Sequence, residues 1–410
     1  MRKNHANPKL IMFALWLLMF SASSQLMIIS PILPQLGAEL NIPEALRGTL
    51  ITAYAVMLAL FALIIGPISD KIGRRRILML GSGAMAFALF LHNFAFDYYS
   101  LLIVRALAGC AGGMLSGACV AYVGDYFPYE KRGWANGWIA TGVAVGLILG
   151  IPIGTILAEW FGFRGPFALF SCTMYAAFML IWLAVPQPDV QRSTGRLTPT
   201  IAFKNYINMA AQPQILTIAS VYGLMYLGIS LYSIYLPSWL NETFGATGYE
   251  IASLFFVGGF ATILSGPRAG KLSDRIGRKS LIIGACIGLS LTMVFTTALV
   301  KAFWISYPLF FLSMLLQGAR IGPFQALISE IVPAQQRGSM MSLAIALGQI
   351  GMGLGGVISG LTYSKYGYIS NTVLGAFSVL LMALIIKLFV TEPSLSTAVV
   401  KPEQIPPEQI

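Results

Sequence analysis

The stretch Gly66-Pro-Ile-Ser-Asp70-Lys-Ile-Gly73-Arg74-Arg75 recurs 204 residues further along the chain, as Gly270-Lys-Leu-Ser-Asp274-Arg-Ile-Gly277-Arg278-Lys279. A second pair of stretches lies 205 residues apart: Asp125-Tyr-Phe-Pro-Tyr-Glu-Lys-Arg132-Gly133 and Glu330-Ile-Val-Pro-Ala-Gln-Gln-Arg337-Gly338. Two motifs that repeat at almost one interval indicate that a unit of the chain has been duplicated. Each copy directly follows a long apolar run, so the duplicated unit is built from apolar segments.

The composition excludes a soluble globular protein. Of the 410 residues, 57% are apolar and only 10% are charged, whereas soluble domains have about 45–50% apolar and about 25% charged residues. The nucleotide-binding pattern Gly-x-x-x-x-Gly-Lys-[Ser/Thr] is absent from the sequence, which argues against an ATP-driven pump. No His or Cys cluster has the spacing of metal ligands, so we expect neither a metal nor a cofactor, and we do not expect an enzyme.

Segments of about 20 apolar residues, the length that crosses about 30 Å of hydrocarbon as a helix, recur twelve times between polar breaks. Each must be helical, because lipid offers no hydrogen-bond partner to an open backbone. We expect the helices at 9–36, 46–69, 76–96, 98–124, 135–160, 164–186, 214–240, 249–270, 279–300, 304–330, 339–364 and 369–390. The sequence therefore predicts an all-α membrane protein of twelve transmembrane helices, arranged as two six-helix bundles related by duplication.

The basic residues predict the orientation of the chain. If the amino terminus is inside, only four of the 26 Lys and Arg residues fall in outer loops, namely Arg47, Arg164, Lys301 and Lys365. Cytoplasmic loops are the ones that collect Lys and Arg, so we expect both termini in the cytoplasm. The net charge of +11 then requires no nucleic-acid partner.

The longest polar break divides the chain near its middle. We expect an N-terminal six-helix bundle at 1–190, a cytoplasmic linker at 191–213, and a C-terminal bundle with a short cytoplasmic tail at 214–410. The predicted protein is a monomer that passes many times through a membrane, which we expect to be a bacterial cytoplasmic (inner) membrane.

The repeated stretch fits G-x-x-x-D-[RK]-x-G-[RK]-[RK], and in a twelve-helix chain it resembles the loop signature of the major facilitator superfamily. The resemblance covers nearly the whole chain. It implies two bundles that rock about a central site, with the repeated motifs latching the halves together in the outward-facing state. The residues concerned are Gly66, Asp70, Gly73, Arg74, Gly270, Asp274, Gly277, Arg278, Asp125, Arg132, Glu330 and Arg337. Alternatively, their charges only anchor the topology at the inner lipid headgroups.

Three further stretches resemble the branch of that family that contains the twelve-helix drug and metabolite exporters. They are the proline pair Pro31 and Pro34, the run Arg105-Ala-Leu-Ala-Gly109, and a fifth-helix motif made of Gly137, Gly146, Gly150, Pro152 and Gly154. The resemblance implies export by antiport and gives Arg105 a part in coupling. In this chain Ile151 separates the third glycine from the proline, which departs from the family pattern. The glycines also fit plain close packing of helices.

Two arginines, Arg105 and Arg320, lie inside predicted helices. A charge in hydrocarbon costs at least about 2.5–3.5 kcal/mol, so each marks a candidate functional site. No carboxylate is expected at mid-membrane, and Ser21 to Gln25 is neutral where many proton antiporters of the family carry an acid. The guanidinium of Arg320 suits a carboxylate, sulfonate or phosphate, while a packed arginine bonded to carbonyl groups remains open for both residues.

In the family that this chain resembles, helices 1, 4, 7 and 10 line the central cavity. The candidate substrate-binding residues on those helices are Arg320, Gln317, Gln25, Tyr222 and Tyr226. The two tyrosines are one helical turn apart and so can stack on an aromatic ligand. The buried amides of the two glutamines fit interhelical bonding equally well.

These observations favour a secondary active transporter that exports small amphiphilic or aromatic compounds by proton antiport through alternating access. Its partners would be a small-molecule substrate, the lipid bilayer and protons. Two alternatives remain at this point: a proton-independent organic-anion carrier or exchanger anchored on Arg320, and a non-transporting membrane sensor.

Overall fold

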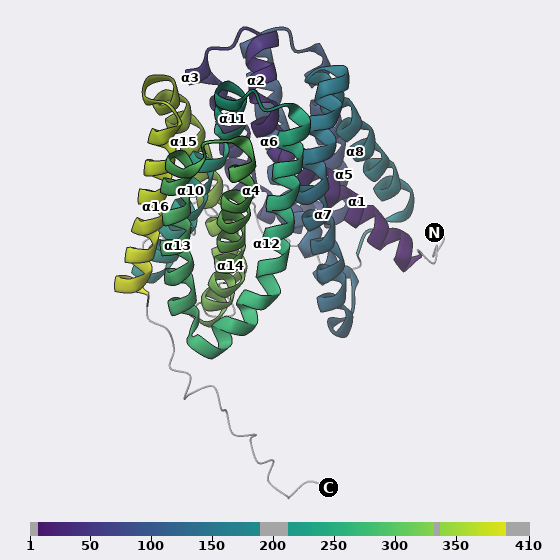
Figure 1. Ribbon diagram of the computed structural model, residues 1–410. Helices are drawn as coiled ribbons and strands as arrows, with labels where there is room; N and C mark the ends of the chain where they lie inside the picture. Colours follow the sequence, from purple (N-terminus) through teal and green to yellow (C-terminus); the bar gives the residue numbers. More distant parts are fainter. Residues whose placement is uncertain (1–6, 189–211, 332–336, 391–410) are drawn as a thin grey trace, which may run out of the picture.

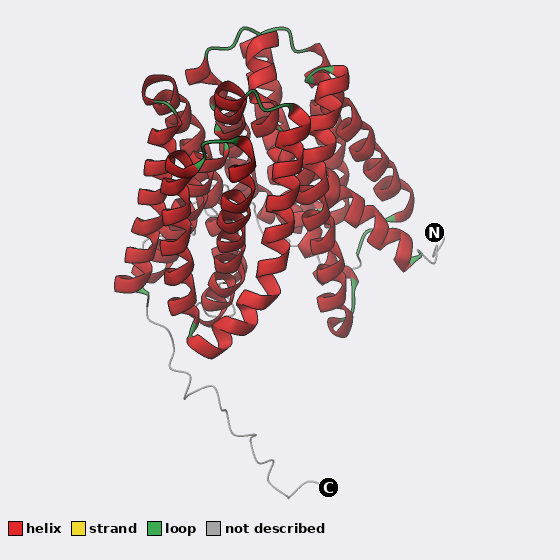
Figure 2. Ribbon diagram, viewed as in Figure 1, coloured by secondary structure: helices red, strands yellow, loops and turns green. Residues whose placement is uncertain are grey.

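The computed structural model describes residues 7–188, 212–331 and 337–390. Helices make up all the regular secondary structure of these residues (Figures 1 and 2). The first half contains α1 (Pro8–Met27), α2 (Ile29–Glu39), α3 (Glu44–Arg47), α4 (Thr49–Ile72), α5 (Arg74–Leu91), η1 (His92–Phe94), α6 (Tyr98–Tyr126), α7 (Tyr129–Phe161) and α8 (Arg164–Ala184). The second half contains α10 (Pro213–Ser233), α11 (Leu236–Phe244), α12 (Gly248–Ile276), α13 (Arg278–Leu299), η2 (Phe303–Ile305), α14 (Ser306–Ile331), α15 (Arg337–Tyr366) and α16 (Tyr368–Phe389).

Eleven helical stretches of the described residues are long and apolar enough to cross a membrane. The remaining predicted span is α14, which has 26 residues but carries the polar Gln317 and Arg320. The expected class, an all-α membrane protein with the twelve-helix architecture, is confirmed. Most of the predicted linker at 191–213 lies outside the described residues, so its proposed role as a linker stays a prediction.

The first helix of each half is broken toward its carboxyl end, where the sequence predicts one continuous span. The break at Ile28 separates α1 from α2, and the break after Ser233 separates α10 from α11. Pro31 follows the first break and Pro237 follows the second, 206 residues further on. Because proline has no N–H for the carbonyl four residues before it, each proline interrupts the hydrogen bonding of its helix. Figure 1 shows α2 and α11 together at one end of the molecule.

The repeated signature is mostly helical, although the sequence predicts a loop. The helix α4 continues to Ile72 and α12 continues to Ile276, so Gly66 and Gly270 lie inside helices. Only one residue in each copy leaves the helix: Gly73, with φ of 106°, and Gly277, with φ of 91°. Glycine is favoured at a positive φ because it has no Cβ, and this single-residue turn is what reverses the chain.

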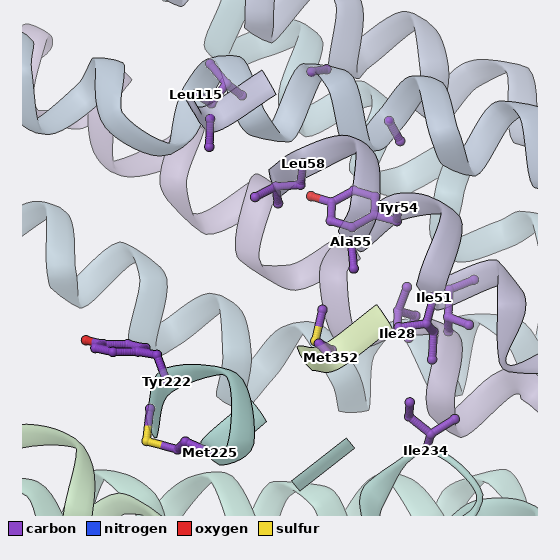
Figure 3. Packing of buried hydrophobic residues seen from close by; sticks show 14 of the residues in the cluster. Ile28, Ile51, Tyr54, Ala55, Leu58, Leu115, Tyr222, Met225, Ile234 and Met352 are labelled. Atoms are coloured by element: carbon purple, nitrogen blue, oxygen red, sulfur yellow. The ribbon is translucent and has the colours of Figure 1, made fainter. Parts of the chain in front are cut away.

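The two halves pack along α4 with α15 and along α7 with α12, and the short helices α2 and α11 also meet. Gly48, just before α4, lies directly against α15, because an added Cβ there would lie 1.9 Å from the carbonyl oxygen of Gly356. Figure 3 shows the buried side chains in this region, which include Tyr54 and Ala55 of α4, Met352 of α15, and Tyr222 and Met225 of α10. The hydrophobic core is therefore continuous across the interface of the halves.

Candidate transport site

Arg105 of α6 is completely buried in the first half. Its Nη1 donates to the side-chain oxygen of Gln25 at 3.3 Å, and its Nε donates to the carbonyl of Leu50 at 3.5 Å. The guanidinium carbon also lies 4.6 Å from the centre of the Tyr54 ring, a cation–π contact. The arginine therefore joins α1, α4 and α6.

Tyr54 belongs to this cluster and was missed by reasoning from the sequence. Its hydroxyl accepts a hydrogen bond from Nε2 of Gln25 at 2.9 Å, so tyrosine, glutamine and arginine form one network. Two glycines of α6 make room for it: an added Cβ would lie 2.3 Å from the Tyr54 carbonyl oxygen at Gly109, and 2.5 Å from its hydroxyl at Gly112. Those glycines, just after Arg105 in the sequence, are the signal that indicates a large neighbour.

The positive charge of Arg105 is held without an acid. Among the described residues, none of its hydrogen-bond partners is a carboxylate, and one of its terminal nitrogens, Nη2, has no hydrogen-bond partner. The neutral carbonyl, amide and ring contacts compensate only part of the cost of burying a guanidinium. A spare donor on a buried cation can take an additional acceptor when the surrounding helices move.

Arg320 of α14 is also completely buried, but it lies inside the second half. Its Nη2 donates to the carbonyl of Met225 at 3.3 Å and to the side-chain oxygen of Gln317. Its Nη1 faces the sulfur of Met382 at 3.5 Å and that of Cys286 at 4.0 Å. In this conformation the side chain is enclosed and points from α14 toward α10, α13 and α16, so a place for Arg320 on the substrate path stays a prediction. These contacts match the other interpretation, a packed arginine bonded to carbonyl groups.

The tyrosines of α10 stack as their spacing predicts. The rings of Tyr222 and Tyr226 lie 6.4 Å apart with an angle of 12° between their planes. Tyr222 also contacts Phe324 of α14, with ring centres 5.3 Å apart, and it is nearly buried, whereas Tyr226 is half-buried. The five predicted binding residues thus form two clusters: Gln25 lies with Arg105 in the first half, and the other four lie between α10 and α14 in the second.

The glycines of α7 form a straight row against the first helix of the chain. Four of them, spaced by four residues, face four residues that are spaced in the same way: Gly142 faces Trp16, Gly146 faces Phe20, Gly150 faces Ser24 and Gly154 faces Ile28. An added Cβ would come within 2.1–2.7 Å of the facing residue at each place. The two helices therefore run parallel and too close together for any side chain larger than hydrogen.

This row corrects the predicted fifth-helix motif in one respect. Gly137 does not belong to it, since an added Cβ there would meet nothing within 4 Å, and Gly142 takes its place. Pro152 lies inside α7, which continues through it to Phe161. The close-packing interpretation accounts for Gly146, Gly150 and Gly154, and the structure assigns no such role to Gly137.

Hydrogen bonds join the halves at the end that holds α2, α3 and α11 (Figure 1). The hydroxyl of Ser30 donates to the carbonyls of Ser233 at 2.8 Å and Ile234 at 3.0 Å. The hydroxyl of Tyr235 donates to the carbonyl of Glu44 at 2.5 Å. Ser30 thereby supplies a hydrogen-bond donor to the carbonyl of Ser233, which has no helical donor because Pro237 lacks an N–H. We call this end the joined end.

The charged motifs lie at the opposite end, and two ion pairs described there join residues of the same half. Arg74 donates to the carboxylate of Asp125 at 2.8 Å, and Asp274 lies 3.9 Å from Arg278, which is four residues further on, across the turn at Gly277. Arg132 donates to the backbone carbonyl of Phe127, five residues before it. Three predicted members of this set, Asp70, Glu330 and Arg337, have side chains outside the part of the structure that is described, so their latch role stays a prediction.

Comparison with known proteins identifies the architecture. Residues 15–218 and 218–407 each match the model of the Major Facilitator Superfamily. The chain belongs to the major facilitator superfamily. It is a multi-pass membrane transporter for small molecules and not an enzyme, as its relatives are transporters.

Relatives of this transporter include multidrug resistance proteins. It is 28% identical over 373 residues to "Multidrug resistance protein MdtG" of Proteus mirabilis, a match that covers 87% of this chain and 90% of the relative. It is 26% identical over 376 residues to the protein of the same name from Yersinia enterocolitica, covering 88% of each. Among solved structures, a D-xylose-proton symporter matches with a TM-score of 0.74 at 19% identity, covering 94% of this chain and 98% of the symporter, which supports the fold.

Proposed function

We propose that this major facilitator transporter exports small amphiphilic or aromatic compounds through alternating access, in antiport with protons. The observation that carries the proposal is the set of bonds between the halves at the joined end, such as Ser30 to Ile234 at 3.0 Å. A transporter that alternates must close one end of its path while the other end is available to substrate. The similarity to multidrug resistance proteins along nearly the whole chain supports export.

The direction follows from the proposed orientation. The end opposite the joined end carries the basic clusters around Arg74 and Arg278, which belong on the cytoplasmic side of a membrane. On that basis both termini are cytoplasmic, the joined end faces outward, and the conformation is the one that loads substrate from the cytoplasm. The bacterial relatives favour a bacterial inner membrane as its location.

The aromatic pair on α10 is the proposed contact for an aromatic substrate. Tyr226 is half-buried while its partner Tyr222 is packed against Phe324, so one ring is held in place and the other is partly accessible. A planar aromatic group can stack on such a ring, and the contact contributes roughly 0.5–1.5 kcal/mol beyond burial. Gln325, which is exposed on the same helix as Phe324, adds a polar contact beside the pair.

Arg105 is the proposed coupling residue. From α6 it contacts α1 through Gln25 and α4 through Leu50 and Tyr54. A change in the acceptors around its guanidinium therefore alters the packing of three helices of the first half at once. The neutral residues from Ser21 to Gln25 make this site different from one that binds its proton on a helix-1 carboxylate.

The test uses proteoliposomes that contain the full-length protein and a fluorescent amphiphilic aromatic dye, with a pH gradient imposed in either direction. We expect dye movement to follow the gradient, to fall at least tenfold in Arg105→Gln, and to recover in part in Arg105→Lys, which keeps the charge. Arg47→Gln, a change at a half-buried outer arginine, is the control. Dye movement that ignores the gradient would rule out proton antiport, and no dye movement at all would rule out the substrate class.

An organic-anion carrier is the second candidate, and one observation favours it. No carboxylate of the described residues pairs with Arg320, so its positive charge is available to an acid that reaches it. The enclosure of Arg320 means that this function needs a second conformation in which α14 exposes the side chain. Uptake of an aromatic sulfonate by the same proteoliposomes, lost in Arg320→Gln while that variant stays folded, would favour this candidate over the exporter.

A further inference from the structure

An open groove of about 420 Å³ lies on the second half, between α12, α13 and α14. Its volume falls within the range of about 300–1,000 Å³ that small-molecule sites occupy. The lining is almost wholly apolar and includes Leu264, Leu272, Ile276, Gly284, Leu315 and Leu316. Leu272 and Ile276 are about half exposed, at 45% and 51%, so the groove opens on the outside of the bundle. In a membrane-spanning chain, an open apolar groove of this kind meets lipid.

One strongly basic side chain borders this apolar groove. Arg268 is exposed, and among the described residues its Nη1 donates only to the carbonyl of Leu264 one turn earlier in α12, at 3.1 Å. Arg275 lies seven residues, about two turns, beyond Arg268 and so on nearly the same side of the helix. Lys271 lies between them and is exposed as well. The nearby carboxylate, Asp274, is already close to Arg278 at 3.9 Å, so this side of α12 carries excess positive charge.

The depth of Arg268 fits a lipid phosphate. It stands eight residues before the end of α12 at Ile276, which is about 12 Å at the rise of an α-helix. A long arginine side chain reaches from such a depth toward the headgroups while its stem stays against apolar surface. The groove therefore offers an apolar channel and a cation at the boundary where an anionic phospholipid has its acyl chains and its phosphate.

The first half has different residues at the positions of Arg268 and Gly284. At the interval of 204 residues, Arg268 corresponds to Ile64, and Gly284 corresponds to Leu80. An added Cβ at Gly284 would meet nothing within 4 Å, so that glycine leaves its part of the groove open. Both differences concern the same groove: the second half has an arginine where the first half has an isoleucine, and a glycine where the first half has a leucine. Shared topology does not require either change.

We propose that this groove is a binding site for one anionic phospholipid of the surrounding leaflet. An acyl chain lies along Leu272, Leu315 and Leu316, and the lipid phosphate accepts hydrogen bonds from Arg268. Lys271 and Arg275 add long-range attraction for the negative headgroup. The site is separate from Arg105 and from the Tyr222 and Tyr226 pair, so it stands whether or not the chain exports drugs.

The experiment measures lipid binding directly. Purified full-length protein is titrated with dioleoyl-phosphatidylglycerol, or with the matching phosphatidylcholine, and bound lipid is counted by native mass spectrometry. We expect one phosphatidylglycerol to bind at least tenfold more tightly than phosphatidylcholine. The phosphate of either lipid can accept charge-assisted hydrogen bonds from Arg268, but only phosphatidylglycerol has a net negative charge that the basic side of α12 attracts. Soluble glycerol phosphate at the same concentration should not bind, since it has no acyl chain.

Two variants place in the second half the residues that the first half has at the corresponding positions. Arg268→Ile should reduce the preference for phosphatidylglycerol about tenfold, and Gly284→Leu should reduce the binding of both lipids by filling the groove. Arg76→Gln, which removes an exposed cation at the same end of the first half, is the charge-matched control and should bind as the wild type does.

The proposal is overturned if wild-type protein binds the two lipids equally, if Arg268→Ile retains the preference, or if Arg76→Gln loses it to the same degree. Circular dichroism and elution volume establish that each variant is folded. If Gly284→Leu fails to fold, the comparison of Arg268→Ile with Arg76→Gln still decides the question. Binding of glycerol phosphate as tight as that of the lipid would also overturn it, since the apolar groove would then contribute nothing.

Discussion

The carboxylate of Glu159, near the end of α7, accepts a hydrogen bond of 2.5 Å from the backbone N–H of Gly248, the first residue of α12. An acid of the first half thus satisfies the amino end of a helix in the second half, where a negative charge is favourable. Next to it, the indole N–H of Trp160 donates to the hydroxyl of Tyr249. This contact closes the joined end on the side of α7, as Ser30 and Tyr235 close it elsewhere.

Glu159→Gln should favour opening of the joined end. The substitution keeps an acceptor but removes the charge, which costs about 0.3–1 kcal/mol at a helix terminus and shifts the equilibrium about two- to fivefold. Distances between spin labels placed on α7 and α12 at this end, measured in lipid nanodiscs, should show a larger open population. An unchanged distribution would mean that the bond adds nothing to closure.

Ser30→Ala should have a similar effect with a different cause. The change removes the donor that occupies the carbonyls of Ser233 and Ile234, so a polar group freed by Pro237 loses its partner at a cost of about 1–3 kcal/mol. The same spin-label measurement across α2 and α11 tests this. In a Pro237→Ala background the helix supplies its own N–H, so the effect of Ser30→Ala should shrink there; an effect of equal size in both backgrounds would contradict the argument.

Gly150→Leu should unfold or strongly destabilise the first half. A Cβ at that position lies 2.4 Å from the Cβ of Ser24, and α1 cannot move away without losing the rest of the glycine row. We expect a loss of more than about 2 kcal/mol, seen as a lower melting temperature in detergent. Gly137→Leu, on the same helix but facing open space, is the matched control and should melt as the wild type does.

Gln25→Leu should destabilise the protein more than Tyr54→Phe. The first change takes an acceptor from the buried guanidinium of Arg105, which costs about 1–3 kcal/mol, while the second keeps the aromatic ring and removes only a hydroxyl, which costs about 1 kcal/mol. Chemical unfolding in mixed micelles orders the two variants. A larger loss in Tyr54→Phe would mean that the hydroxyl, and not the amide oxygen, holds the network together.

The pattern of apolar segments predicts most of the fold. The spans between polar breaks agree with α6, α8, α13 and α16 to within a few residues at each end. The carboxylates lie near helix ends as expected, for example Asp97 before α6 and Glu159 in the last turn of α7. These features depend on length and hydropathy, which the sequence states directly.

The sequence says less about the direction in which a side chain points. The depth of Arg320 along α14 follows from counting residues, but its rotation toward α13 and α16 is set by the packing of four helices. The same holds for Tyr54. Nothing in its sequence position predicts its hydrogen bond to Gln25, which depends on how the glycines of α6 pack against it. The breaks after Ile28 and Ser233 were visible as prolines, yet hydropathy alone joins the two pieces of each helix into one span.

The two buried arginines have an electrical consequence. Arg105 and Arg320 belong to different halves, and the described residues give neither of them a carboxylate partner. When the halves rock, any movement of these side chains along the membrane normal carries net positive charge through the transmembrane voltage. A unit charge that crosses 100 mV gains or loses about 2.3 kcal/mol, so moving both through a tenth of that drop contributes about 0.5 kcal/mol. On the proposed alternating access, we therefore expect membrane potential to contribute to the balance between the two conformations, even when the cargo is neutral.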